Sequence, residues 1–179
     1  METQLIYPVG EQDFPSLRKA GMVYVDKTAL IHQLASSGKY YFLSRPRRFG
    51  KSLLISTLEA YFQGRKELFH GLAIERLEKD WTEHPVLRLD MSRDKYATTA
   101  NLLSMLDGML SFYERQYGIT PPDGASPGTR LNLLIEMVHE QTGKPDVFPI
   151  SCSVSSHEQP EQQDNRHHDG ISIDHSVSS

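Results

Sequence analysis

The chain lacks several features that define whole classes of protein. It has one cysteine, Cys152, in 179 residues, which excludes an intramolecular disulfide and is typical of a reducing compartment. No apolar run approaches the length of a membrane span, and the N-terminus lacks the basic and then apolar pattern of a signal peptide. Apolar residues make up 38% of the sequence, and the mean hydropathy is −0.47. These absences predict one soluble, cytoplasmic domain of ordinary size that has no membrane partner.

An excess of charge of one sign is also missing from most of the chain. Residues 1–150 carry 18 basic and 18 acidic side chains, whereas residues 151–179 carry one arginine and five acids. The net charge of −4 therefore belongs to the C-terminal segment. A neutral body with an acidic end argues against a chain devoted to nucleic-acid binding.

What the chain does have is a basic turn between a short apolar run and an amphipathic run. The turn follows Tyr40–Leu43 and ends in Gly50-Lys51-Ser52, directly before the apolar positions of a helix that we expect to run to about Gln63. The start of a helix presents backbone N–H groups and a partial positive charge, which together bind anions. Glycine, an ammonium and a hydroxyl at this point are the parts of a phosphate-and-magnesium site, with Lys51 on the β/γ phosphates and Ser52 on the metal. The pattern predicts a P-loop.

The match to the usual P-loop pattern is incomplete. In G-x-x-x-x-G-K-[ST] the first glycine falls at position 45, where this chain has Arg45. The alternative is an ordinary turn between a strand and a helix with solvated arginines. We expect the nucleotide to be bound by the whole loop: Arg45, Pro46, Arg47, Arg48, Phe49, Gly50, Lys51 and Ser52.

Apolar periodicity predicts the other elements. Besides the strand at 40–43 and the helix after the turn, we expect helices over about 29–36, 67–79, 99–117 and 131–141, and a strand over 85–90. This alternation of strands and helices indicates an α/β protein with a parallel sheet, in which ligands bind at the carboxyl ends of the strands.

Four further residues are candidates for either a functional or a structural role. Asp90 ends the strand at 85–90 and is either a magnesium partner or a turn residue. Asp26 and Thr28 precede a helix and are candidates for plain N-capping, while Lys27 between them could instead reach toward a nucleotide.

Several segments together resemble the bacterial AAA-ATPase-like domain family. They are Tyr7-Pro8-Val9-Gly10, Asp13-Phe14, Tyr24-Val25-Asp26-Lys27-Thr28, Phe42 to Ser52 (including Arg-Pro-Arg-Arg-Phe-Gly-Lys-Ser) and Phe69 to Ile74. The family is a divergent group of P-loop NTPases, often followed by a PD-(D/E)XK nuclease-like domain, and it tolerates arginine at the position of Arg45. The resemblance implies an α/β P-loop sandwich of three layers, ATP and Mg²⁺ as ligands, and a protein or nucleic-acid partner through the nuclease-like domain.

The chain departs from this family after Pro145. The family has an apolar strand ending in Asp-Glu here, the Walker B element, whereas this chain reads Asp146-Val147-Phe148-Pro149-Ile150-Ser151-Cys152. Pro149 lacks the N–H that a central strand uses, and residues 151–179 are rich in serine and histidine without aromatics. We therefore expect an AAA-ATPase-like domain over 1–145, cut short before Walker B and weak or inactive in hydrolysis, and a disordered tail over 146–179. The alternatives are a non-catalytic interaction fragment and the remnant of a frameshifted gene.

Overall fold

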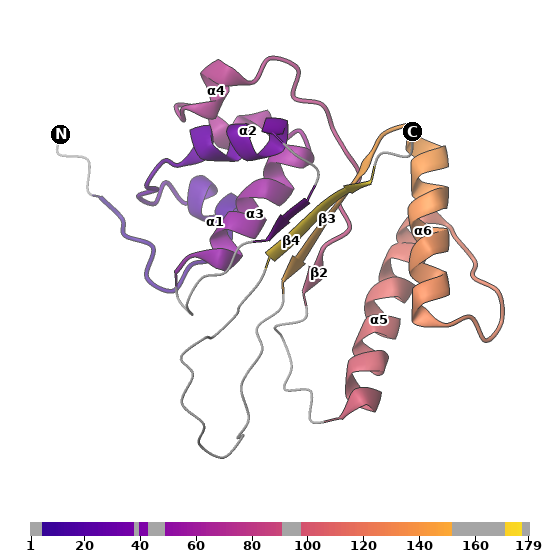
Figure 1. The fold of residues 1–179 in the computed structure, drawn as a ribbon. Helices are drawn as coiled ribbons and strands as arrows, with labels where there is room; N and C mark the ends of the chain where they lie inside the picture. The colour runs from indigo at the N-terminus through magenta and orange to yellow at the C-terminus, as the bar shows by residue number, and fades with distance from the viewer. Residues whose placement is uncertain (1–4, 38–39, 43–48, 91–97, 152–170, 177–179) are drawn as a thin grey trace.

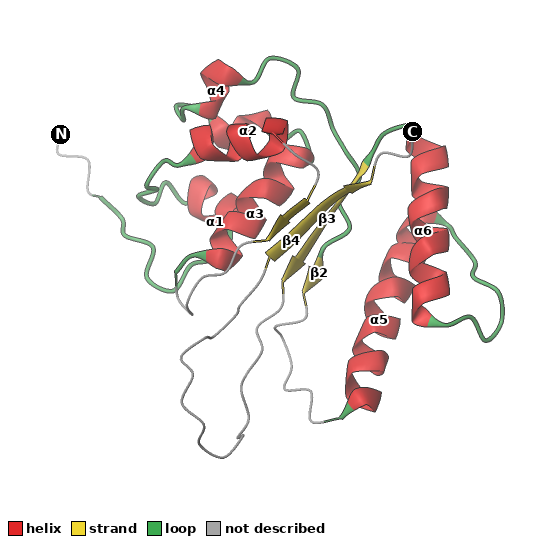
Figure 2. Ribbon diagram, in the orientation of Figure 1, coloured by secondary structure: helices red, strands yellow, loops and turns green. Residues whose placement is uncertain are grey.

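The computed structural model describes residues 5–37, 40–42, 49–90, 98–151 and 171–176. Its helical elements are α1 (Phe14–Lys19), α2 (Thr28–Ser37), α3 (Lys51–Phe62), the 3-10 helix η1 (Lys66–Phe69), α4 (Ile74–Leu77), α5 (Thr99–Tyr117) and α6 (Pro127–Thr142). Its strands are β1 (Tyr40–Phe42), β2 (Leu89–Asp90), β3 (Asp146–Ser151) and β4 (Ile171–Ser176). Helical residues far outnumber strand residues (Figure 2). No helix in these ranges has both the length and the apolar character needed to cross a membrane.

The four strands form one mixed sheet in the order β1-β4-β3-β2. β2 pairs with β3 in parallel, whereas β4 is antiparallel to both β1 and β3. β1, β2 and β3 therefore point the same way, and β4 runs between β1 and β3 in the opposite direction (Figure 1).

The prediction of a partial P-loop three-layer sandwich with a parallel sheet is therefore wrong. The described chain is mostly helical, its strands are short, and two of the three strand pairings are antiparallel. The antiparallel pairings come from the segment for which we expected disorder. The composition of this segment does not reveal its strand pattern, in which Ile171 and Ile173 alternate with Ser172 and Asp174. The segment also finds backbone partners on both sides, because the facing edges of β1 and β3 offer them.

Pro149 does lie in a central strand, contrary to our expectation. Val147 on β3 forms hydrogen bonds with the residues before and after Val86. Its N–H donates to Pro85 O at 3.0 Å, and its C=O accepts from Leu87 N at 2.9 Å. The next amide of β3 facing this neighbour belongs to residue 149, and proline has no N–H to give. The ladder is interrupted there and resumes where Leu89 pairs with Ile150. Pro149 therefore removes one backbone hydrogen bond from the pairing with β2.

Helices lie on both sides of the sheet (Figure 1). Neighbouring residues Val86 and Leu87 belong to different core clusters, because successive side chains of an extended segment point to opposite faces. The cluster with Val86 packs α1 to α4 and η1 around Phe14, Ile55 and Phe69, and the cluster with Leu87 packs α5 against α6.

The predicted helices at 29–36 and 99–117 are confirmed, as is the helix after the basic turn. The helical segment expected at 67–79 is two short pieces, η1 and α4, because Gly71 between them has a φ of +79°. α6 begins at Pro127, earlier than predicted, with Ser126 Oγ accepting from Thr129 N at 3.2 Å. Serine followed by proline is a helix-start signal that our interpretation did not use.

Asp26 accepts hydrogen bonds at the start of α2, as the capping interpretation predicted, whereas Thr28 is the first residue of α2 and accepts from the start of α4. Asp26 Oδ1 accepts from the N–H of Thr28 at 2.8 Å and from its hydroxyl at 2.6 Å. Asp26 Oδ2 accepts from Ala73 N at 2.7 Å, and Thr28 Oγ1 accepts from Ile74 N at 3.1 Å. The start of α2 is thereby joined to the start of α4. Lys27 is exposed.

We expect Asp26→Asn to destabilise the fold by about 1–2 kcal/mol at pH 7, since charge-assisted hydrogen bonds become neutral ones or are lost. Burial on its own would raise the pKa of Asp26, but the hydrogen bonds from Thr28 and Ala73 outweigh it and hold the pKa below its ordinary value of 3.8. The contribution of this carboxylate is therefore complete above about pH 4 and is lost as the pH falls through the lower pKa of the folded state.

Urea unfolding at pH 7 and near pH 2 measures this difference. The gap between wild type and Asp26→Asn should shrink at the lower pH, while Asp123→Asn, at an exposed loop position, should differ little from wild type at either pH. An undiminished gap near pH 2 would show that the charge of Asp26 does not stabilise the fold.

Gly64 marks a close approach between the end of α3 and the segment that leads to β2. Its φ is +66°, and a Cβ built on it would lie 2.9 Å from the backbone oxygen of Trp81. Gly64→Ala therefore adds a backbone clash to the left-handed strain, and we expect a loss of about 2–4 kcal/mol in unfolding free energy. Gly71→Ala, with a φ of +79° and open space around the new Cβ, carries the strain alone and should lose about 1 kcal/mol. Equal losses in thermal or urea unfolding would contradict this account.

Candidate functional site

The N-terminus of α3 has the geometry of an anion-binding helix end. Gly50 is its N-cap, with φ +76° and ψ +21°, a left-handed conformation that glycine adopts without strain. Gly50 provides no side-chain cap, and its C=O accepts the first helical bond from Leu54 N at 2.9 Å. No acidic side chain lies in the first turn to neutralise the positive end of the helix dipole.

Lys51 and Ser52 occupy the first turn of α3, as the sequence predicted. Both are half-buried, and the Nζ atom of Lys51 is withdrawn from solvent. Phe49, just before the helix, is 64% exposed. Arg45, Pro46, Arg47 and Arg48 lie outside the described residues. Of the predicted nucleotide-binding loop, the structure therefore describes only Phe49, Gly50, Lys51 and Ser52.

The strand directions bring the predicted site residues to one edge of the sheet. β1, which leads into the loop before α3, points the same way as β2 and β3. The carboxyl ends of these three strands therefore lie at the same end of the sheet, and α3 begins at that end (Figure 1). Asp90 at the end of β2, Ser151 at the end of β3 and Gly50 before α3 all lie at this end of the sheet.

Asp90 is held by an arginine that the sequence interpretation missed. Arg88 Nη2 lies 3.5 Å from Asp90 Oδ2, and Arg88 Nη1 lies 3.0 Å from Glu59 Oε2 on α3. The side chain of Asp90 is only 14% exposed. Arg88 and Asp90 are two residues apart in an extended segment, so they share the face toward α3. That spacing was the signal in the sequence, but Glu59 is 29 residues away in the chain and no local pattern connects it.

The backbone of Arg88 is held by α5, which packs on the face of the sheet opposite to α3. Tyr113 on α5 accepts from Arg88 N at 2.7 Å through its hydroxyl oxygen and donates to Arg88 O at 3.0 Å. Burial is the main reason why the pKa of Tyr113 rises to about 12, so the hydroxyl keeps its proton for this contact. Asp90 is thus connected through Arg88 to both α3 and α5.

Metal ligands are sparse in the described chain: residues 5–37, 40–42, 49–90, 98–151 and 171–176 contain no group of three or more His, Cys, Asp or Glu side chains that could hold an ion. Ser52 in the first turn of α3 and Asp90 at the end of β2 are the candidate oxygen ligands of the predicted site. A magnesium ion bound by so few protein groups takes its other oxygens from water and phosphate.

Comparison with known proteins gives the chain its family. The family model described as a predicted AAA-ATPase (AAA-ATPase-like) matches residues 8–150. An uncharacterized protein in the vnfD 5′ region of Azotobacter chroococcum mcd 1 is 37% identical over 139 residues, which cover 76% of this chain and 27% of the relative. The chain thus spans about a quarter of the length of this curated relative. No solved structure gives a significant match.

The family match runs from the segment before α1 to the end of β3 and contains the basic turn with Gly50, Lys51 and Ser52. It covers most of the described residues. The chain therefore belongs to the AAA-ATPase-like family of predicted AAA-ATPases.

Proposed function

We propose that the chain binds ATP together with Mg²⁺ at the N-terminus of α3. The observation that carries this proposal is the left-handed Gly50, which opens a twelve-residue helix without a side-chain cap and is followed at once by Lys51 and Ser52. Backbone amides and the helix dipole favour a phosphate group at this point. Membership of a family of predicted AAA-ATPases supports nucleotide use.

The proposed roles follow from the chemistry of each group. Lys51 places its ammonium on the β/γ phosphates, Ser52 gives its hydroxyl to Mg²⁺, and Asp90 offers a carboxylate to the metal from the end of β2. The loop of Arg45, Pro46, Arg47, Arg48 and Phe49 surrounds the phosphates and adds positive charge. Bound Mg²⁺ would neutralise part of the phosphate charge.

We further propose that hydrolysis is weak or absent. Activation of the attacking water needs a positioned base, and the metal needs a stable carboxylate partner. β3 ends in Ile150-Ser151 without the acidic pair that the resemblance to the family leads us to expect at the end of this segment. Asp90 is already in contact with Arg88 at 3.5 Å, so it is not a free carboxylate that could act as the base.

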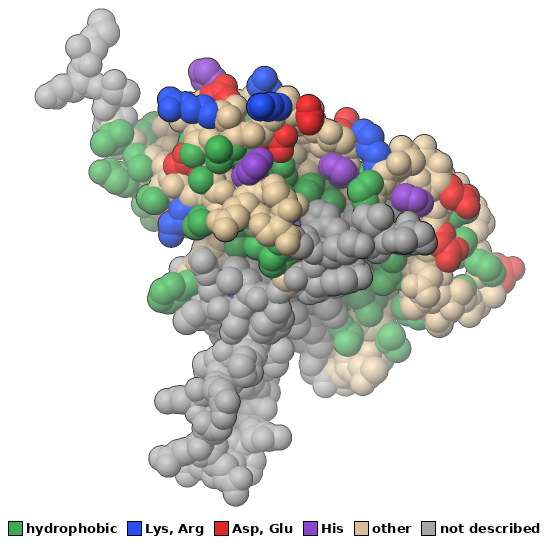
Figure 3. Space-filling view, turned by 45° about the horizontal axis from the view of Figure 1, so that its top comes forward, with side chains coloured by type: hydrophobic (Ala, Val, Ile, Leu, Met, Phe, Trp, Pro, Cys, Tyr) green, Lys and Arg blue, Asp and Glu red, His purple; other side chains and the backbone are tan. Residues whose placement is uncertain are grey.

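A contact between the arginine loop and a nucleic-acid backbone is the competing function. On the face shown in Figure 3, the Lys and Arg side chains of the described residues are interspersed with Asp and Glu rather than gathered. A binding surface for nucleic acid is usually a clustered basic patch.

Calorimetric titration with ATP, ADP and AMP, each with Mg²⁺, tests the proposal. We expect the affinity to fall in that order, by roughly tenfold or more at each step, because each lost phosphate removes charge-assisted contacts of about 1.5–3 kcal/mol with α3 and Lys51. Equal affinity for the three nucleotides, or salt-dependent DNA binding that ATP does not displace, would contradict it.

A further inference from the structure

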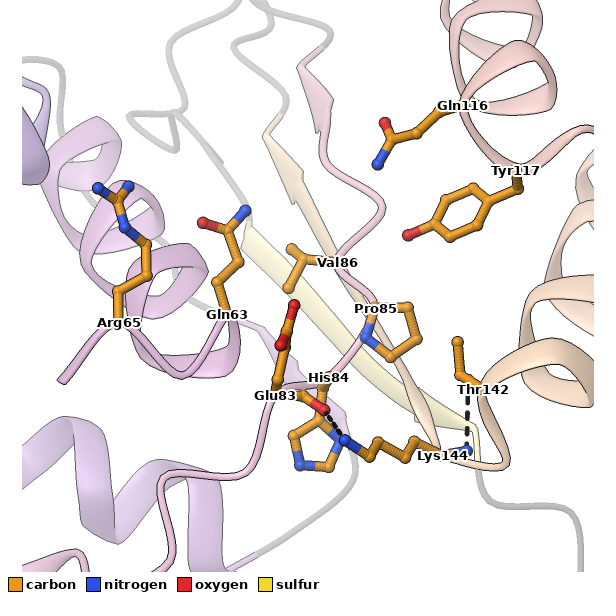
Figure 4. Close-up of a pocket in the computed structure, with 10 residues that line it drawn as sticks. All are labelled: Gln63, Arg65, Glu83, His84, Pro85, Val86, Gln116, Tyr117, Thr142 and Lys144. Atoms are coloured by element: carbon orange, nitrogen blue, oxygen red, sulfur yellow. Dashed lines mark hydrogen bonds between the residues drawn. The ribbon is translucent and has the colours of Figure 1, made fainter.

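A cavity lies beside the amino ends of β2 and β3, at the end of the sheet opposite the start of α3. It has a volume of about 660 Å³ and is lined by residues that follow α3, end α5 and precede β2 and β3: Gln63, Arg65, Glu83, His84, Pro85, Val86, Gln116, Tyr117, Thr142 and Lys144 (Figure 4). This volume is in the range of small-molecule sites. α3 separates it from Lys51 by the length of twelve residues.

The backbone of Val86 faces this cavity with a donor and an acceptor. Pro85 O and Leu87 N bond to Val147 on β3, so by alternation the N–H and C=O of Val86 point to the other side, away from the sheet. The N–H and C=O of Arg88 point the same way and are both occupied by the hydroxyl of Tyr113. Within the described residues, no hydrogen bond reaches either group of Val86, although this residue is only 9% exposed. Backbone groups of this kind are rarely left unpaired, so the N–H and C=O of Val86 are available to water or to a ligand in the cavity.

Along the outer edge of the extended segment 84–88, only Val86 has an unpaired N–H and C=O among the described residues. On one side Tyr113 closes the edge at Arg88, and on the other side His84 N donates to Phe62 O at 2.7 Å. A peptide that extends the sheet needs several consecutive open residues, which this edge does not have. A small ligand that presents one donor beside one acceptor needs only Val86.

The side chains around Val86 match an uncharged ligand. Gln116 and Tyr117 point toward it from the end of α5, and Gln63 points toward it from the end of α3 (Figure 4). Each carboxamide provides further donors and acceptors, and the ring of Tyr117 and the side chains of Pro85 and Val86 provide apolar surface. Among the charged lining residues, Lys144 Nζ donates to Glu83 O at 2.7 Å and Arg65 Nε lies 3.5 Å from Glu67 Oε1. The carboxylate of Glu83 lies beside Val86 and is a further hydrogen-bond acceptor, which disfavours an anionic ligand (Figure 4).

We propose that this cavity binds the base of a nucleoside, with the N–H and C=O of Val86 reading its hydrogen-bonding edge. The Watson–Crick edge of every common nucleobase places a donor beside an acceptor, which is the complement of one extended residue. Gln63 and Gln116 bond to the remaining polar groups of the base. The site is separate from the ATP site and does not depend on it.

The test uses adenosine, guanosine, cytidine and uridine. These nucleosides lack phosphate, so we do not expect them to bind at the start of α3. Titration of the ¹⁵N-labelled chain should shift the amide resonance of Val86 with at least one of them. The derivative of that nucleoside with its edge donor methylated, for example 3-methyluridine or N6,N6-dimethyladenosine, should bind at least tenfold more weakly.

Variants then locate the site. Gln116→Ala and Gln63→Ala should each weaken binding roughly 3- to 10-fold, from the loss of one or two hydrogen bonds, whereas Gln33→Ala on the exposed face of α2 should have no effect. Lys51→Ala should leave nucleoside binding unchanged, so failure of the ATP proposal and failure of this one are separable. The proposal is overturned if no nucleoside shifts Val86, if the methylated derivative binds equally well, or if Lys51→Ala abolishes the binding.

Discussion

Replacing Lys51 with alanine is expected to weaken ATP binding by about 30-fold or more. The ammonium is the one side-chain cation in the first turn of α3, where the amides after Gly50 face the same anion. A charge-assisted contact to phosphate contributes about 2–3 kcal/mol, and each 1.4 kcal/mol is a factor of ten in affinity. Calorimetric titration of wild type and Lys51→Ala with Mg-ATP measures the ratio.

The matched control is Lys79→Ala, which removes an exposed lysine beyond α4 and leaves the start of α3 intact. It should bind ATP as wild type does. Circular dichroism and urea unfolding of both variants show whether the fold is retained, because Lys51 Nζ is withdrawn from solvent. Unchanged ATP affinity in a folded Lys51→Ala variant would remove the phosphate role of this lysine.

Arg130→Met is expected to destabilise the fold by about 3–5 kcal/mol, the largest loss that we foresee for a substitution away from the candidate site. Arg130 on α6 forms a bidentate pair with Glu114 on α5, with Nε to Oε1 at 2.7 Å and Nη2 to Oε2 at 2.6 Å. It also donates to Ser111 Oγ at 2.8 Å and to Asp107. The two paired side chains are 10% and 8% exposed, so removal of one leaves the other charged and buried without its partner.

A double variant separates this penalty from the net value of the pair. Arg130→Met combined with Glu114→Leu replaces both charges with apolar groups beside Leu110 and Leu134, and it should recover most of the lost stability. Arg115→Met, at an exposed position next to Glu114, should change the free energy of unfolding by less than about 0.5 kcal/mol. A loss below about 1 kcal/mol for Arg130→Met in urea unfolding would show that the pair does not hold α5 to α6.

The helices could be predicted because their signals are local. The apolar stripe between Thr99 and Tyr117 has the period of a helix, and Thr98 and Gly118 cap its two ends as helix termini are usually capped. The start of α3 was predictable for the same reason, since glycine, lysine and serine directly precede an amphipathic run. Local spacing also placed Asp26 before α2, although its bond to Ala73 N could not be foreseen from that spacing.

The sheet and the residues around Asp90 could not be predicted in this way, because their partners are distant in sequence. β4 is formed by residues whose composition suggested disorder, and its position depends on edges that β1 and β3 leave unpaired. Arg88 gains its role from Glu59 and Tyr113, which lie on two different helices. Pairing across such distances depends on the complete fold, and a single sequence read in short windows does not contain it.

The most direct test of the central claim follows the backbone amides at the start of α3. Titration of the ¹⁵N-labelled chain with Mg-ATP should shift the amide resonances of Gly50, Lys51 and Ser52, and tripolyphosphate should shift the same three, because the phosphates are the group recognised there. Shifts confined to other parts of the chain, or none at saturating Mg-ATP, would contradict the assignment of a phosphate site to this helix end.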